Sequence, residues 1–388
     1  MEQSNMRKLA HQFMRNAIKV SANENVWIEY QGPEAQKLAD VCAREVHAAG
    51  AHPHMVDGGS GFINATITGM SDENITAHSM SMLETMQTMQ GYIRIKDDAD
   101  QSKITLPPKQ RNFYKLAMSK MITYRVNNVR WLVTAAPTEY FAVACGMTFP
   151  QFEEFYLNVC LVNYNAMTAA VKPLETIMAK AKSVRIFSPN QQTDLIFSIE
   201  NIGAKACTGI RNIPDGECFT APVKDSINGI IKFGPSCYEG QRFSFIKLLF
   251  KRGRIEVAES ESPERTAQLN EILDIDAGAR FIGEFAINFN PYVLHPTGCI
   301  LFDEKINGGI HMAAGKCYDD VSNGNNSSIH WDMVHIQRPD YGGGEIWIDD
   351  QLIRKDGIFV VPELMALNPD HLKTVANSSC NYYPVGSY

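Results

Sequence analysis

The chain has 388 residues, of which 45% are hydrophobic and 20% are charged, and its net charge is −7 at pH 7. This composition predicts a globular protein of two or three domains, and the lack of a basic cluster or of an apolar run of about 18 residues argues against nucleic-acid partners and membrane spans. The N-terminus has no signal-peptide pattern, and nine cysteines without a CxxC pair favour reduced thiols in the cytoplasm.

The first part of the chain alternates between helical and extended patterns. Apolar spacing predicts the following elements in chain order: helix 3–19, strand 26–30, helix 33–49, strand 54–56, helix 108–124, strand 129–135 and a long helical stretch at 150–182. Because strand–helix–strand units favour parallel pairing, we expect an N-terminal doubly wound α/β domain.

Short strand patterns dominate the second part of the chain. They lie at 183–187, 193–199, 228–233, 243–250, 254–258, 282–289, 328–334 and 345–348. The change in character predicts a boundary near residue 182. We therefore expect an α/β domain at 1–182, followed by a β-rich mixed α+β catalytic domain at 183–388.

Two glutamates in the second part lie in patterns that suit metal binding. Glu217 follows a Pro-Asp-Gly turn, where a solvated surface glutamate would be the more common interpretation. Glu284 lies in an otherwise apolar strand, where a carboxylate is costly unless it is paired or bound to a cation. Period-2 alternation leaves a solvent-facing Glu284 equally open.

A third group contains imidazoles and one more carboxylate. His311 lies in a Gly-rich apolar segment, and His330 and Asp332 project to the same face of an extended segment. Neutral imidazole together with carboxylate is a common ligand set for zinc, iron and manganese. His295 and His335 lie nearby, and we expect both to be structural.

These segments together resemble the aminopeptidase T family of dinuclear metallo-aminopeptidases. The resemblance extends over nearly the whole chain and is most specific at 212–222 and 225–229. It implies two divalent metal ions, zinc, cobalt or manganese, held by the following residues: Glu217, Glu284, His311, His330 and Asp332. It also implies that Glu284 bridges the ions and that Tyr318 is catalytic. The segment between His311 and His330 is shorter than in typical members.

The family resemblance implies a hydrolase that removes N-terminal residues from peptides, or acts on another amide, as a homodimer. Charge arithmetic agrees with two metals, because a single dication among the three carboxylates Glu217, Glu284 and Asp332 would leave the site negative. The N-terminal domain would limit substrate access or form dimer contacts.

One alternative is an oxygenase. A branch similar to this family contains dihydroxypyridine ring-cleaving dioxygenases with a single Fe(II). The triad His311, His330 and Asp332 would suffice for that ion. A degenerate binding protein is a further alternative, disfavoured because all five ligand types are present.

Overall fold

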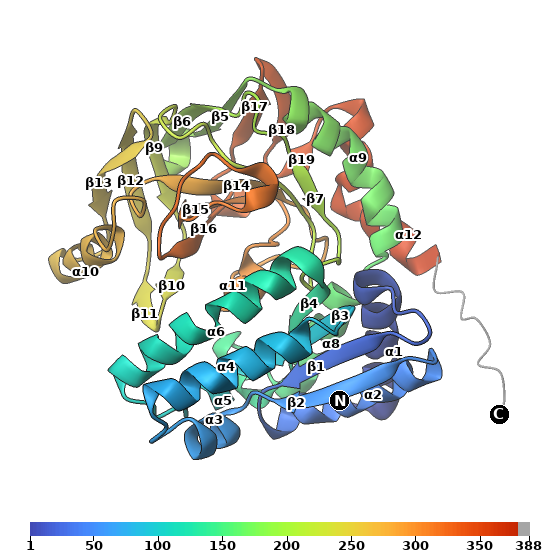
Figure 1. Cartoon of the computed structure of the whole chain (residues 1–388). Helices are drawn as coiled ribbons and strands as arrows, with labels where there is room; N and C mark the ends of the chain where they lie inside the picture. Colours follow the sequence, from blue (N-terminus) through green and yellow to red (C-terminus); the bar gives the residue numbers. More distant parts are fainter. Residues whose placement is uncertain (379–388) are drawn as a thin grey trace. The chain divides into compact units, whose positions relative to one another are not determined.

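The structure, a computed structural model, describes residues 1–378 (Figure 1). The chain forms two compact units. Unit 1 comprises Met1–Leu161 together with Gly209–Pro214, and unit 2 comprises Val162–Thr208 together with the chain from Asp215 onward. Among the described residues, no helix is long and apolar enough to cross a membrane.

Unit 1 is built on a four-stranded parallel sheet with the strand order β2-β1-β3-β4. Its strands are β1 (Asn25–Tyr30), β2 (His52–Asp57), β3 (Gly91–Lys96) and β4 (Arg130–Ala135). Its helices are α1 (Gln3–Gln12), a π-helical turn (Phe13–Ile18), α2 (Gly32–Ala48), α3 (Ser60–Thr66), α4 (Asp72–Met86), α5 (Asp98–Gln101), α6 (Pro108–Asn128), α7 (Glu139–Ala144) and α8 (Phe149–Cys160).

Helices cover both faces of this parallel sheet. In Figure 1, α4 and α6 lie on one face, and α1 and α2 lie on the other. Trp27 and Tyr92 from the sheet pack against Met86 and Met118 from α4 and α6 in one apolar cluster. The predicted doubly wound α/β fold is confirmed.

The predicted helical stretch at 150–182 is two helices. Helix α8 ends at Cys160, and α9 (Tyr164–Lys180) begins after Asn163, whose side chain accepts a hydrogen bond from the backbone N–H of Ala166. Asparagine stabilises a helix start in this way, so a new helix begins where the apolar pattern alone continues. The break also separates the units, since α8 belongs to unit 1 and α9 to unit 2.

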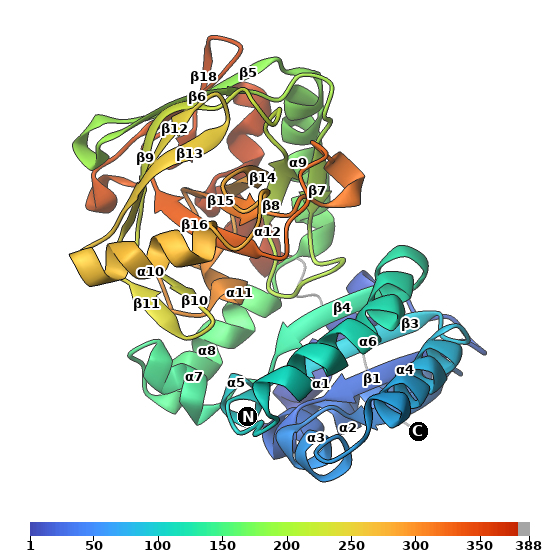
Figure 2. The ribbon, with the colours of Figure 1, turned by 60° about the vertical axis from the view of Figure 1, so that its left-hand side comes forward.

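Unit 2 contains two large antiparallel sheets. The eight-stranded sheet has the order β13-β12-β9-β6-β5-β17-β18-β19, and the five-stranded sheet has the order β16-β15-β14-β8-β7. Figure 2 shows β14, β15 and β16 side by side next to the larger sheet. Phe197 of the larger sheet and Phe285 of the smaller one meet edge to face with ring centroids 5.0 Å apart. The predicted β-rich character of this part is confirmed.

The elements of unit 2 have the following bounds. The strands are β5 (Ser183–Ser188), β6 (Thr193–Ser198), β7 (Lys205–Cys207), β8 (Glu217–Thr220), β9 (Asn228–Phe233), β10 (Ser236–Tyr238), β11 (Gln241–Phe243), β12 (Ile246–Lys251), β13 (Arg254–Glu259), β14 (Ile282–Asn288), β15 (Gly309–Gly315), β16 (His330–Ile336), β17 (Glu345–Ile348), β18 (Gln351–Lys355) and β19 (Ile358–Phe359). Besides α9, the helices are α10 (Pro263–Leu273), α11 (Ile300–Asp303) and α12 (Pro369–Ser378).

Candidate metal centre

Four neighbouring strands of the five-stranded sheet bring the predicted metal ligands together. Glu217 begins β8, Glu284 lies in β14, His311 in β15, and His330 and Asp332 in β16. His330 and Asp332 are two residues apart and share a face of β16, and the register of the four strands places the other three ligands on the same side of the sheet. The structure therefore joins segments that are more than 100 residues apart in the sequence.

Small residues leave room for this cluster. In the pairing of the strands, Ala286 lies opposite His311, and Ala313 lies opposite both Glu284 and Asp332. Because an alanine side chain is a single methyl group, the larger polar side chains beside it can converge above the sheet.

The carboxylates and imidazoles lie close to one another. His311 Nε2 is 3.4 Å from Glu284 Oε1, 3.8 Å from Glu217 Oε2 and 4.0 Å from Asp332 Oδ1. His330 Nε2 is 3.3 Å from Glu284 Oε2 and 3.4 Å from Asp332 Oδ1. The two oxygens of Glu284 thus face two different imidazoles, which is the arrangement that a bridging carboxylate requires.

The opposite nitrogen of each imidazole is held by an acceptor. His311 Nδ1 lies 3.0 Å from both Asn288 Oδ1 and the Glu304 carbonyl, and His330 Nδ1 lies 2.8 Å from the Lys316 carbonyl. Since a carbonyl can only accept, Nδ1 carries the hydrogen in both rings. Nε2 therefore faces the carboxylates, and a metal ion that displaced its proton would find the lone pair directed at the cluster, as in histidines that bind metals.

Electrostatics in the cluster suit a cation. Burial lowers the pKa of His311, but Glu284, Glu217 and Asp332 more than offset this and raise it to about 9. Asp332 Oδ1 is buried and accepts no hydrogen bond from any described residue. A buried acceptor without a donor is costly, and a divalent cation would satisfy it. The donor set therefore fits divalent metal ions.

A buried lysine borders the cluster, and no sequence pattern predicted its role. Lys305 is 1% exposed, and its Nζ is 2.6 Å from Glu217 Oε2, 3.0 Å from Glu304 Oε1 and 3.6 Å from Asp215 Oδ1. Burial lowers the pKa of Lys305, but these three carboxylates raise it well above its ordinary value, so the ammonium stays charged. In the sequence, Asp-Glu-Lys looks like an ordinary surface charge run.

Lys305 and the carboxylates beside it add to the charge balance of the cluster. One ammonium, that of Lys305, accompanies five carboxylates: Asp215, Glu217, Glu284, Glu304 and Asp332. With all five carboxylates ionised and both imidazoles neutral, four negative charges remain, which is the charge that two divalent cations would balance.

Tyr318 lies at the rim of the cluster. Its ring packs edge to face on Phe219 with centroids 5.8 Å apart, and it lies 4.9 Å from the His330 ring, while 44% of the residue is exposed. The surrounding protein raises the pKa of Tyr318, so its hydroxyl keeps the proton and can donate a hydrogen bond.

A carboxylate outside the cluster anchors the loop that carries Tyr318. Asp276 accepts hydrogen bonds from the backbone N–H of Ser328 at 2.7 Å, from the Ser327 hydroxyl at 2.8 Å and from the Gly278 N–H at 2.9 Å. These donors outweigh the effect of burial and lower the pKa of Asp276 to about 2. The anchor fixes the chain directly before His330.

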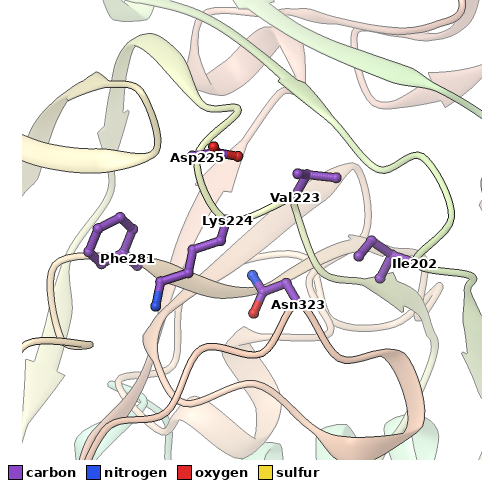
Figure 3. A pocket seen from close by; sticks show the side chains of 6 residues that line it. All are labelled: Ile202, Val223, Lys224, Asp225, Phe281 and Asn323. Atoms are coloured by element: carbon purple, nitrogen blue, oxygen red, sulfur yellow. The ribbon is translucent and has the colours of Figure 1, made fainter.

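Unit 2 also has a surface hollow beside the loop that carries Tyr318. It has a volume of about 470 Å³, and Asn323 on its wall donates to the carbonyls of Pro222 and Ile282 at 2.7 and 2.8 Å. Figure 3 shows Lys224 extending toward Phe281, whose ring centroid lies 4.9 Å from the lysine Nζ. None of the proposed metal ligands lines this hollow.

The other two histidines near the motifs do not join the cluster. His335 is fully buried, with Nδ1 2.8 Å from the Lys232 carbonyl and Nε2 3.0 Å from Ser188 Oγ. Burial lowers its pKa to about 4, so it is neutral. His295 Nδ1 lies 3.1 Å from the Tyr341 hydroxyl at the surface.

Comparison with known families identifies the family of this chain. Residues 2–356 match the M29 peptidase family, described as thermophilic metalloproteases. The chain belongs to this family. The predicted resemblance to a metallopeptidase family is thereby confirmed, and a divalent metal is the cofactor that this family implies.

Curated relatives are aminopeptidases. The chain is 32% identical to aminopeptidase 2 of Geobacillus stearothermophilus over 174 residues, and 30% identical to aminopeptidase T of Thermus thermophilus over 161 residues. These alignments cover 40% and 36% of this chain, and about two fifths of each relative, namely 40% and 39%.

Solved structures share the fold over nearly the whole chain. Wild-type AmpT from Thermus thermophilus superposes with a TM-score of 0.74 at 19% identity, covering 92% of this chain and 100% of that one. A 2,5-dihydroxypyridine dioxygenase from Pseudomonas putida KT2440 gives a TM-score of 0.62 at 15% identity, covering 93% and 98%. At these identities the likeness concerns the fold alone.

Proposed function

We propose that this protein is an aminopeptidase that uses two divalent cations to hydrolyse the N-terminal bond of peptides or related amides. The observation that carries the proposal is Glu284, whose two oxygens lie 3.4 and 3.3 Å from the Nε2 atoms of His311 and His330. A buried carboxylate between two ring nitrogens can serve two cations at once.

Each cation would have its own set of donors. Glu284, His330 and Asp332 offer ligand atoms within 4.8 Å of one another and would hold one ion. Glu217 and His311, together with the other oxygen of Glu284, would hold the second. Divalent cations bound to these side chains would supply Lewis acidity for activating water and polarising the scissile carbonyl.

Residues of the chain itself would complete the chemistry. The protonated hydroxyl of Tyr318 can donate a hydrogen bond to the oxyanion of the tetrahedral state. Lys305 holds Glu217 in position through its 2.6 Å ion pair, and Asn288 and Glu304 fix the ring of His311. Zinc, cobalt and manganese are the proposed metals.

The remaining parts of the proposal concern assembly and location. None of the cysteines that the structure describes is part of a disulfide, in keeping with a reducing cytoplasm. A homodimer, with residues 1–182 limiting access to the site or forming the dimer contact, remains a prediction from the family resemblance.

A one-iron dioxygenase is the second candidate. His311, His330 and Asp332 lie close enough to form a facial triad, with Nε2 to Oδ1 distances of 4.0 and 3.4 Å. Such a site has no use for Glu217 and Glu284, which are 5% and 4% exposed within the same cluster. Two extra buried carboxylates favour the peptidase.

Replacement of Glu284 distinguishes the two candidates. Glu284→Gln removes the charge that neutralises two adjacent cations. In the two-metal enzyme it should lower metal content from two ions per chain and reduce hydrolysis of an aminoacyl arylamide by a hundredfold or more, on the order of a lost transition-state contact. Metal titration by calorimetry and the arylamidase rate are the measurements.

Glu256→Gln provides the matched control, because Glu256 is an exposed strand carboxylate of the same unit. It should keep both metal content and rate. Full metal content and activity in Glu284→Gln would defeat the bridging assignment. One iron per chain, retained in Glu284→Gln, would favour the dioxygenase.

A further inference from the structure

Unit 1 contains a pocket of its own between its sheet and helices α4 and α6. The cavity has a volume of about 470 Å³, and its walls include Glu29 of β1, Asp57 of β2 and Arg94 of β3, together with residues of α4 and α6. All residues that line it belong to unit 1.

One end of this pocket, at Gln31, Asp57 and Gly58, lies where β1 and β2 end, and the topology of the sheet explains the opening there. In the order β2-β1-β3-β4, the chain moves outward to β2 on one side of β1 and then crosses to β3 on the other. The connections after β1 and β3 therefore leave in opposite directions, and a crevice opens between the two strand ends. In open α/β sheets, small ligands bind in such crevices.

The walls combine an apolar surface with an excess of positive charge. The apolar part is formed by Phe62, Ile63, Met82, Leu106, Met118 and Ile122. The charged side chains are four cations and two anions: Arg94, Arg111, Lys115, Arg125, Glu29 and Asp57. Such a surface favours an anion with an apolar body.

The acidic side chains of the pocket already have partners. Glu29 forms an ion pair with Arg94 at 3.1 Å and accepts a hydrogen bond from the Tyr92 hydroxyl at 2.7 Å. Asp57 accepts from the backbone N–H of Gly59 at 2.8 Å. The charge left for a ligand is therefore positive.

Arg125 is the best-positioned of these cations. Its guanidinium stacks on the rings of Tyr92 and Trp131, with distances of 4.7 and 4.8 Å to the centroids. Its Nε is buried and has no hydrogen-bond acceptor among the described residues. A flat guanidinium held between two rings is preorganised for a carboxylate, and an unsatisfied buried donor gains from an acceptor.

We propose that this pocket binds a small aromatic carboxylic acid, with the carboxylate on Arg125 and the ring against Met82 and Met118. The planar guanidinium of Arg125 favours a planar anion such as a carboxylate, and the flexible methionine side chains adapt to a flat apolar ring. This pocket belongs to unit 1, whereas the metal centre belongs to unit 2, and the inference does not depend on the peptidase proposal.

Calorimetric titration with 2-naphthylacetate tests the site, and 2-naphthylacetamide serves as the neutral probe of the same shape. We expect one acid per chain, bound at least tenfold more tightly than the amide. Equal affinity of acid and amide, or no binding of the acid at millimolar concentration, would overturn the proposal.

Three variants locate the binding. Arg125→Gln should weaken the acid at least tenfold, and Ile122→Trp should weaken it at least fivefold by filling the pocket. Ile122 is 43% exposed, so this second variant tests the site without removing a buried charge. Lys120→Gln, an exposed residue of the same helix, should bind within twofold of the parent. Acid binding that survives both pocket variants lies elsewhere, for instance at the metal centre, and would refute the assignment.

Discussion

Glu284 shows why a polar residue in an apolar strand is informative. It is 4% exposed, so its charge has been moved out of water at a cost that only strong partners offset. Burial raises the pKa of Glu284, but His311 and His330 lower it overall, so the carboxylate is ionised. In the metal-bound enzyme, cations held by these two imidazoles would take over this compensation of the Glu284 charge.

Tyr318 yields a prediction at the scale of one atom. Tyr318→Phe keeps the ring that packs on Phe219 and deletes only the hydroxyl. If the hydroxyl donates to the oxyanion, kcat should fall about a hundredfold while metal content stays unchanged. Steady-state kinetics on an aminoacyl arylamide, with elemental analysis of the same sample, provide the measurement.

Tyr341→Phe is a suitable control, because Tyr341 is a half-buried tyrosine of the same unit whose hydroxyl faces His295. It should leave kcat within twofold. A Tyr318→Phe enzyme with nearly normal kcat would leave Tyr318 a packing role only.

At the scale of elements, local patterns predicted most strands and the parallel sheet. Glu217 shows the limit of such patterns, since its turn suggests solvent, yet Asp215 and Glu217 are 0% and 5% exposed. Glu217 is buried in the pairing of β8 with β14, a contact between segments about 70 residues apart that no local pattern encodes. The family motifs predict the five metal ligands, whereas Lys305 belongs to none of those motifs.

The Asp276 anchor leads to a prediction at this scale. Asp276→Ala removes the acceptor for Ser327 and Ser328 and should loosen the loop that carries Tyr318. Amide hydrogen exchange at 316–329 should become at least tenfold faster, with a smaller exchange change in β14, because the sheet bonds remain.

Glu271→Ala, an exposed carboxylate on α10, is the reference for this experiment. It should leave exchange in the loop as it is. If Asp276→Ala exchanged no faster than Glu271→Ala, the loop would be held by its other contacts, such as those of Asn325 with Gly278 and Gly315.

At the scale of the whole molecule, the metal centre belongs to one unit only. All five proposed ligands lie in unit 2, where strands β8, β14, β15 and β16 carry them. Removing the cations should leave uncompensated carboxylates in that sheet and destabilise it, since a ligand that binds only the folded state stabilises it by mass action.

Chelation followed by hydrogen exchange measures this effect. Exchange should accelerate in β14–β16 and remain within about twofold in β1 and β3, whose sheet holds no proposed ligand. Restoring zinc, cobalt or manganese should reverse the change. Equal acceleration in both sheets, or none in β14–β16, would contradict a metal centre confined to unit 2.

The short return of the chain into unit 1 constrains any attempt to divide the protein. Gly209–Pro214 belongs to the parallel-sheet unit, where the backbone of Ile213 donates to the Val133 carbonyl at 3.2 Å. Three residues after Pro214 comes Glu217. A fragment that starts at Val162 would therefore lack strand β4, to which residues 209–214 are hydrogen-bonded. A fragment that stops at Leu161 would lack residues 209–214 themselves. Because the two units are interleaved in the sequence, transferring either complete unit into another protein requires more than one cut.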